Sequence, residues 1–377
     1  MPTLTYMTTL QFDFGAIKQL GDSLRALGVE RPLICTDKGL VALGLVDQVR
    51  QVIPNEFTPA IFDGTPENPT EEAVDLAAAE YRAQGCDGVV AFGGGSSIDL
   101  AKAVSLRVTH EGDLNGFTVM QGGRDKIGPV APLIAVPTTS GTGSEVSRGA
   151  VIVMRNGEKL ILASPHLLPK ISICDPELTL GLPPLLTAAT GMDAITHCIE
   201  AVMSPNIDPP AEAVGLDGIR RGLGEGHLER AVADGADRDA RWNMMMASSE
   251  GAMAFVKGLG AVHSMSHAAG RIKALNLHHG TLNAVCLPNV IRFNADHVGN
   301  RLDRVRDAMG LEAGADVAEA VERLNERLGL PPSLGAMGVT ADMVPGMVEH
   351  AVKDVCNFTN PRPVDAAAFE DLFARTL

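Results

Sequence analysis

The chain has 377 residues, enough for two domains, and 45% of them are apolar, so large buried cores can form. Asp and Glu number 46 against 31 Lys and Arg, which gives a formal net charge of −15. This acid excess disfavours nucleic acid and anionic membranes as partners, because the average surface would repel both.

The N-terminal segment carries no targeting signal that we recognise. Met1 to Gly15 contains no Lys or Arg, so it lacks the basic start of a secretory signal peptide. No uninterrupted apolar run approaches the 18 residues typical of a membrane-spanning helix. The six cysteines are dispersed without a C-x-x-C pair, which indicates reduced, mostly buried thiols. We therefore expect a cytoplasmic protein.

The first half of the chain alternates strand and helix patterns. Buried β-rich runs occupy Arg31 to Thr36, Gly88 to Phe92 and Ala131 to Val136, and Glu71 to Gln84 has helical spacing. Strands that alternate with helices of this length predict a parallel sheet with helices on both faces. We expect a Rossmann-like α/β dinucleotide-binding domain over residues 1–182.

Two glycine- and hydroxyl-rich turns follow predicted strands. Gly93 to Asp99 (GGGSSID) precedes a helical run, and glycines ahead of a helix N-terminus allow close approach of a phosphate. Pro137 to Glu145 (PTTSGTGSE) suits contacts to phosphate or ribose. Asp37, after the first strand, suits ribose hydroxyls and repels a 2′-phosphate, which favours NAD over NADP. Each of these features taken alone is equally well a structural turn.

The second half of the chain is helical in pattern. From Pro183 onward the strand signals fade, and helices are predicted over Leu185–Met203, Arg241–Gly258, Gly260–Lys273 and Val317–Leu328. We expect an all-helical domain over residues 183–377. The cleft between two such domains is the usual ligand site.

Three short motifs of the second half combine histidine with a carboxylate or a second histidine. They are Asp193-x₃-His197, His263-x₃-His267 and His278-His279-Gly280. Spacing of i, i+4 places two side chains on one helix face, close enough to share a metal ion. A carboxylate with imidazoles suits Fe²⁺, Zn²⁺, Co²⁺ or Mn²⁺. A single such histidine is more often structural, whereas the combination favours a metal site.

Motifs along nearly the whole chain resemble the iron-containing (group III) alcohol dehydrogenases. The matching stretches, in family order, are TDKGL (Thr36–Leu40), NPT (Asn68–Thr70), GGGSSIDLAKA (Gly93–Ala103), PTTSGTGSEVS (Pro137–Ser147), EKL (Glu158–Leu160), DPELTLGLPP (Asp175–Pro184), GMDAITHCIEA (Gly191–Ala201), AVHSMSHAAG (Ala261–Gly270), HHGTLNAVCLPNVIRFN (His278–Asn294) and NPR (Asn360–Arg362). The resemblance implies a dehydroquinate synthase-like fold. It also implies NAD(P)-linked interconversion of alcohols with aldehydes or ketones.

The resemblance also assigns roles to individual residues. The metal ligands would be Asp193, His197, His263 and His279, and His267 would be an active-site histidine that does not bind the metal. The cofactor would be lined by Asp37, Asn68, Gly94, Gly95, Ser96, Ser97, Asp99, Thr138, Thr139, Thr142, Lys159, Thr179 and Leu182.

One segment departs from the common family pattern. Two residues more separate Gly270 from the His-Gly pair, and the histidine is doubled. His278 is therefore an alternative to His279 as the fourth ligand. The loop Arg271 to Leu277 is a candidate for reshaping the substrate pocket.

The expected activity is a metal-dependent alcohol dehydrogenase or aldehyde reductase for small or linear aliphatic substrates. The metal would polarise the substrate oxygen during hydride transfer, and His267 would pass the proton. The family favours Fe²⁺, with Zn²⁺ as the alternative, and a homodimer or larger homo-oligomer. The competing interpretations are a dehydroquinate synthase- or glycerol dehydrogenase-type enzyme, and a non-catalytic NAD-binding protein.

Overall fold

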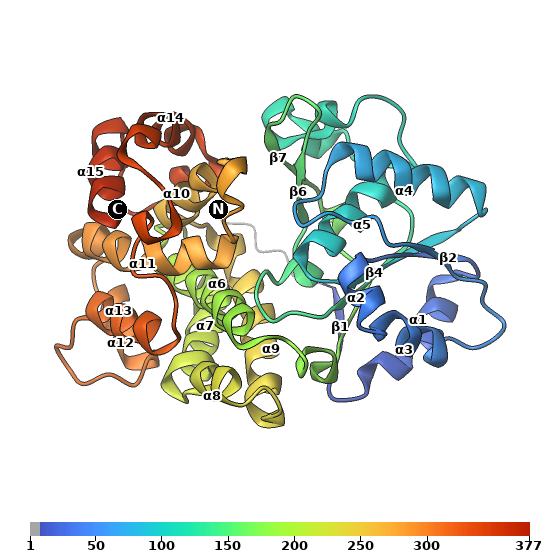
Figure 1. Cartoon of the computed structure of the whole chain (residues 1–377), viewed down its shortest axis with the longest axis horizontal. Coiled ribbons are helices and arrows are strands. Elements are labelled where there is room, and N and C mark those ends of the chain that lie inside the picture. The colour runs from blue at the N-terminus through green and yellow to red at the C-terminus, as the bar shows by residue number, and fades with distance from the viewer. Residues whose placement is uncertain (1–7) are drawn as a thin grey trace. The chain divides into compact units, whose positions relative to one another are not determined.

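The computed structural model describes residues 8–377 and divides them into two units (Figure 1). The α/β unit comprises residues 8–139 and 144–179, and the helical unit comprises residues 140–143 and 180–377. The first seven residues, which belong to the segment used above to argue against a signal peptide, lie outside the described residues.

The α/β unit is built on a six-stranded, fully parallel sheet with the order β1-β8-β5-β4-β2-β3. The strands are β1 (Thr9–Phe12), β2 (Pro32–Cys35), β3 (Ala60–Phe62), β4 (Gly88–Gly93), β5 (Leu133–Pro137) and β8 (Ile171–Cys174). The helices are α1 (Leu20–Leu27), α2 (Lys38–Ala42), α3 (Leu45–Val52), α4 (Glu71–Ala83) and α5 (Gly95–Arg107). The predicted parallel sheet is confirmed.

Each face of this sheet has its own core. Val89 and Ala91 of β4 pack with α4 and α5, whereas Val90 and Phe92 pack with α1 and α3. Successive strand residues point to opposite faces, so a strand covered on both sides must be apolar at every position. This explains why β4 is buried along its whole length.

An antiparallel hairpin of β6 (Gly149–Val153) and β7 (Lys159–Ala163) was absent from the sequence prediction. Its turn contains Asn156-Gly157, with Gly157 at a φ of +84°, and Asn-Gly is a strong hairpin signal. Ala150, Ile152 and Leu162 of the hairpin join the core that contains α4 and α5.

The helical unit contains ten α-helices among the described residues. They are α6 (Pro184–Met203), α7 (Pro209–Ile219), α8 (His227–Ala233), α9 (Arg238–Ala254), α10 (Ala261–Ala269), α11 (His279–Asn294), α12 (Arg301–Ala308), α13 (Val317–Arg327), α14 (Val344–Lys353) and α15 (Ala366–Thr376). Helix α6 is buried on all sides from Thr187 onward and contacts α7, α9 and α11. No described helix has the length and apolar character that a membrane crossing requires.

The observed division differs slightly from the expected boundary after residue 182. It falls between Thr179 and Leu180, and Ser140–Gly143 belongs to the helical unit. A Cβ atom at Gly141 would lie 2.8 Å from Thr190 Cβ, and one at Gly143 would lie 2.2 Å from Ala252 Cβ. This four-residue segment therefore packs tightly on α6 and α9.

Helices α6 and α11 approach each other closely at Gly280. A Cβ atom there would lie 2.2 Å from the carbonyl oxygen of Ala189 and 3.2 Å from Asp193 Cβ. We predict that Gly280→Ala lowers the free energy of unfolding by about 3 kcal/mol, because backbone on the facing helix must move. Urea unfolding measures this change.

Gly346→Ala on α14 is the matched control. No atom lies within 4 Å of an added Cβ at Gly346, so this change is expected to stabilise the helix by up to about 1 kcal/mol. Equal effects of the two substitutions would contradict the close packing of α6 on α11.

Candidate functional site

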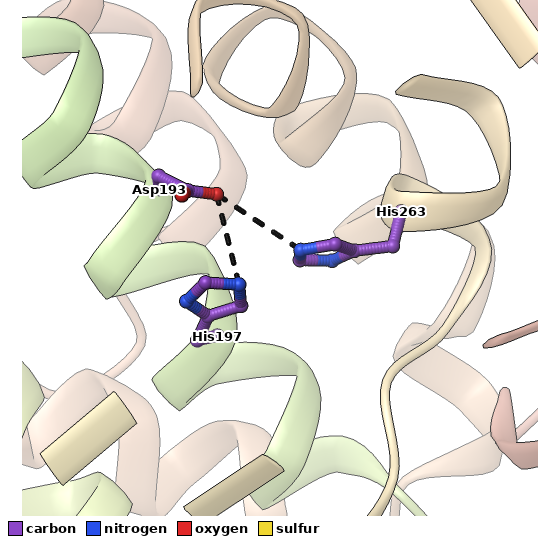
Figure 2. Close-up of side chains that lie close together, drawn as sticks. All are labelled: Asp193, His197 and His263. Atoms are coloured by element: carbon purple, nitrogen blue, oxygen red, sulfur yellow. Dashed lines mark ion pairs between the residues drawn. The ribbon is translucent and has the colours of Figure 1, made fainter. Parts of the chain in front are cut away.

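Four potential metal-binding side chains converge within the helical unit. Asp193 and His197 lie one turn apart on α6, His263 lies on α10, and His279 is the first residue of α11. Asp193 Oδ1 lies 3.7 Å from His197 Nε2, 4.0 Å from His263 Nε2 and 3.7 Å from His279 Nε2. Figure 2 shows His263 facing Asp193 and His197 from a neighbouring helix.

The spacing and the chemistry of these atoms fit one divalent cation. Tetrahedral bonds of about 2.1 Å place donor atoms roughly 3.4 Å apart. The donor atoms of Asp193, His197 and His263 all lie within 4.8 Å of one another, and His279 Nε2 lies 3.7 Å from Asp193 Oδ1. Asp193 is buried, and among the described residues it forms no ion pair with Lys or Arg. A buried carboxylate surrounded by neutral nitrogen donors is stabilised by a bound cation.

Burial sets the protonation of this cluster. It lowers the pKa of His197 to about 4, although the nearby Asp193 carboxylate opposes the shift. Burial acts in the same direction on His263, but the hydrogen bond and charge of Glu200 raise the pKa of His263 above its ordinary value. His279 is the accessible member, with 32% of its side chain exposed.

Two further residues orient the cluster, and the sequence analysis missed both. Glu200 Oε2 lies 2.5 Å from His263 Nδ1, and Glu200 Oε1 accepts a hydrogen bond from the backbone N–H of Val262 at 2.8 Å. Asn283 Nδ2 donates to Asp193 Oδ1 at 2.7 Å. Such outer partners fix the orientation of metal-binding histidines. Glu200 lies three residues after His197, one turn further along α6. The helical spacing of Asp193, His197 and Glu200 could therefore have indicated it from the sequence.

His267 lies beside the four-residue cluster. Its ring stacks on that of His279, with centroids 5.3 Å apart, and its Nδ1 lies 2.9 Å from Asp354 Oδ2. Burial raises the pKa of Asp354, but the His267 interaction outweighs it and holds that pKa well below its usual range. Asp354 is 87 residues away along the chain, and no local pattern pointed to it.

The doubled histidine separates into two environments. His279 reaches Asp193, whereas His278 is the N-cap residue of α11, with its Nδ1 3.5 Å from Thr281 Oγ1. In the preceding loop, Asn276 has a φ of +45° and is the one non-glycine residue with a positive φ among those described.

The predicted cofactor turns lie at one edge of the sheet. Gly93 of β4 pairs in register with Pro137 of β5, and Cys35 of β2 pairs with Ala91, so the three strands end side by side. The chain reverses its order between β2 and β4, which is the usual ligand position in such sheets. Helix α5 begins there with no acidic residue in its first turn, so its N–H groups suit a phosphate.

Several predicted cofactor residues also have structural partners. Asp37 caps α2 by accepting from Leu40 N, and Asp99 accepts from Ser144 Oγ and from Val151 N of the hairpin. The remaining contacts are Ser96 Oγ to Glu67 O, Lys159 Nζ to Asn68 Oδ1 and Thr179 Oγ1 to Pro176 O. Ser97, Thr138 and Thr179 are buried.

The other predicted cofactor residues divide between the two units. Gly94, Gly95 and Thr139 lie at the ends of β4 and β5, and a Cβ atom at Gly94 would lie 3.4 Å from Thr139 Cγ2. Thr142 and Leu182 belong to the helical unit.

Comparison with known proteins identifies related enzymes over the full length. Residues 8–176 match the iron-containing alcohol dehydrogenase family, and residues 187–377 match the C-terminal domain of the same family. The chain is 52% identical to a 4-hydroxybutyrate dehydrogenase from Cupriavidus necator, with all of both chains covered.

Solved structures agree with this relationship. A 1,3-propanediol oxidoreductase superposes with a TM-score of 0.93 at 35% identity, covering all of both chains. A sulfoacetaldehyde reductase from Bifidobacterium kashiwanohense, in complex with NAD⁺, gives a TM-score of 0.91 at 26% identity, covering 100% of this chain and 99% of the other. The chain belongs to the iron-containing alcohol dehydrogenase family and is a metal-dependent, NAD(P)-linked alcohol dehydrogenase.

Proposed function

We propose that Asp193, His197, His263 and His279 bind a single Fe²⁺ ion, with Zn²⁺ as the alternative. The observation that carries this proposal is the arrangement of three imidazole nitrogens within 4.0 Å of one buried carboxylate oxygen. A divalent ion held there supplies Lewis acidity, which stabilises the negative charge that develops on the substrate oxygen. The partial exposure of His279 leaves one side of the cluster accessible to substrate.

NAD is the proposed nucleotide, bound at the sheet edge of the α/β unit. Gly94, Gly95 and the first turn of α5 would receive the pyrophosphate, because their backbone N–H groups and the absence of an acidic side chain suit an anion. Asp37 would bind the adenosine ribose hydroxyls while it continues to cap α2, since a carboxylate oxygen accepts more than one hydrogen bond. The same negative charge disfavours NADP.

His267 is the proposed proton acceptor in alcohol oxidation. Asp354 lies at its Nδ1, which favours the tautomer with the proton on Nδ1 and a lone pair on Nε2. Nε2 would take the proton that leaves the alcohol as the hydride passes to the nicotinamide. In the reducing direction, the same nitrogen would return it.

The proposed substrate is a short ω-hydroxy acid of the 4-hydroxybutyrate type, or the corresponding aldehyde. The 52% identity to a 4-hydroxybutyrate dehydrogenase supports this choice. Arg271 would bind the substrate carboxylate. It lies four residues after His267, just beyond the end of α10 at Ala269, is half-buried, and forms no ion pair among the described residues.

We place the enzyme in the cytoplasm as a homodimer or larger homo-oligomer with no nucleic-acid or membrane partner. All six cysteines are free, and five of them are buried, which suits a reducing compartment. The net charge of −15 supports the absence of an anionic partner.

The metal assignment predicts different effects for two histidines on α10. His263→Ala removes a proposed ligand, so the purified variant should lose its bound metal, measured by elemental analysis. His267→Ala should retain the metal but lower kcat about 100-fold, because proton transfer is lost.

His278→Ala is the control for these variants. His278 is not one of the four proposed ligands and its Nδ1 lies 3.5 Å from Thr281 Oγ1, so both metal content and kcat are expected to stay near the wild-type values. Equal metal loss in the His263 and His267 variants would contradict the separation of ligand and proton acceptor.

The substrate assignment predicts a charge-dependent effect of Arg271→Gln. Its KM for 4-hydroxybutyrate should rise at least about tenfold, because a charge-assisted hydrogen bond is lost, while kinetics with the uncharged butan-1-ol stay unchanged. NADH absorbance measures both reactions.

Lys273→Gln removes an exposed cation from the same loop and serves as the control. We expect it to leave both KM values near those of the wild type. A similar loss of activity towards the acid and the neutral alcohol in the Arg271 variant would refute a carboxylate-binding role.

A further inference from the structure

The first turn of α10 begins without a cap of its own. The helix starts at Ala261, after Gly260, which has no side chain that could accept a hydrogen bond. The first N–H groups of an α-helix have no partner within the helix, and a buried N–H group without a partner is costly. Ala261 and Val262 are both buried. Their N–H groups therefore need acceptors from elsewhere in the chain.

Two side chains from distant segments supply these acceptors. Asn360 Oδ1 accepts a hydrogen bond from the N–H group of Ala261 at 3.0 Å. Glu200 Oε1 accepts one from the N–H group of Val262 at 2.8 Å. A Cβ atom at Gly260 would lie 2.6 Å from Asn360 Oδ1 and 2.9 Å from Glu200 Oε1. The two oxygens therefore take the place that a side chain at position 260 would fill.

The amide of Asn360 uses every hydrogen bond that it can make. Its Oδ1 accepts from Ala261 N and from Asn294 Nδ2, both at 3.0 Å. Its Nδ2 donates to Asn294 Oδ1 at 2.9 Å and to the carbonyl oxygen of Arg362 at 2.6 Å. An asparagine amide has two acceptor sites and two donors, so all of them are filled. Turning the amide over would direct Nδ2 at the N–H group of Ala261, so the orientation of Asn360 is fixed.

Asn294 connects this cap to α11. It is the last residue of that helix and is fully buried. The reciprocal pair of amides therefore joins the C-terminal end of α11 to the N-terminal end of α10. His263 lies in the anchored turn, two residues after Ala261, so the position of its backbone follows from the cap.

We propose that Asn360 is a positioning residue for α10: its amide, braced by Asn294, holds the first turn of the helix so that His263 faces Asp193 and His267 stacks on His279. This inference rests on the proposed metal ligation. All the hydrogen bonds of the Asn360 amide go to other groups, so it acts on the site through the backbone of α10. It gives a role to the Asn-Pro-Arg motif, which the family resemblance matched without assigning one.

Asn360→Leu tests this role, because it keeps most of the side-chain volume and removes the acceptor for Ala261. The experiment uses the full chain, stripped of metal by chelation and titrated with Co²⁺, whose visible absorption reports both affinity and ligand geometry. We expect an affinity for Co²⁺ about 10-fold weaker than that of the wild type and an altered visible spectrum at saturation. The reason is that His263 is no longer held opposite Asp193, and loss of an outer support of a metal ligand typically has an effect of this size.

Hydrogen exchange measures the cap directly. In metal-free Asn360→Leu, the amide protons of residues 261–264 should exchange at least about 10-fold faster than in the wild type, because the first turn of α10 opens more readily. Exchange in α8 should stay unchanged.

Asn243→Leu is the matched control. Asn243 on α9 is buried, donates from Nδ2 to the carbonyl oxygen of Asp239 at 3.0 Å and accepts at Oδ1 from Arg221 Nη1 at 2.8 Å. These partners lie outside α10 and α11. The substitution should lower the Tm and leave both the Co²⁺ affinity and the exchange of residues 261–264 at wild-type values.

The outcomes distinguish this inference from the metal assignment beneath it. Unchanged Co²⁺ affinity or unchanged exchange of residues 261–264 in Asn360→Leu would overturn the positioning role, and so would an equal loss of affinity in Asn243→Leu. Each of these results leaves the ligand set intact. If Asn360→Leu does not fold, wild-type affinity for Co²⁺ in Asn294→Leu, which removes the brace, would overturn the role. If His263→Ala binds Co²⁺ as tightly as the wild type does, both the ligand set and the inference fail.

Discussion

The buried carboxylate of Asp193 is the constraint on which the helical unit depends. A carboxylate removed from water is costly unless a positive charge or strong donors compensate it, and no described Lys or Arg does so here. Three imidazoles and one amide surround it instead, supplied by α6, α10 and α11. Close packing of these helices is therefore a requirement of the site, and glycine at positions 251 and 280 lets neighbouring backbones come within reach of α6.

Three histidines of the helical unit have an oxygen atom at Nδ1. His263 has Glu200 at Nδ1, His279 has Ser266, and His267 has Asp354. In each case an oxygen at the outer nitrogen can hold a proton there, which leaves Nε2 available at the inner edge. The partners differ in charge, whereas the orientation of the three rings follows the same rule. The two charged partners face the buried His263 and the partly exposed His267, and the neutral hydroxyl faces the more accessible His279.

The sequence predicted the helices and strands better than it predicted which side chains of different helices come together. Spacing of i, i+4 paired Asp193 with His197, because helical geometry alone decides that contact. The meeting of α6 with α10 and α11 depends on tertiary packing, which local periodicity does not contain. Family resemblance supplied His263 and His279 as ligands and favoured His279 over His278, and this assignment stays a prediction. Asp354 carried no local signal, since it acts on a residue of another segment, whereas Asn283 lies four residues after His279 on α11, a spacing that the sequence contains.

The loop after α10 differs physically from the helices that hold the cluster. Ile272, Leu275 and Leu277 pack against the helical core, so the loop is anchored through its apolar residues. Asn276 adopts a left-handed conformation between two of them, which costs backbone energy that this packing must offset. The clustered side chains are therefore held by buried helices, whereas the segment between α10 and α11 is a short loop fixed by three apolar contacts.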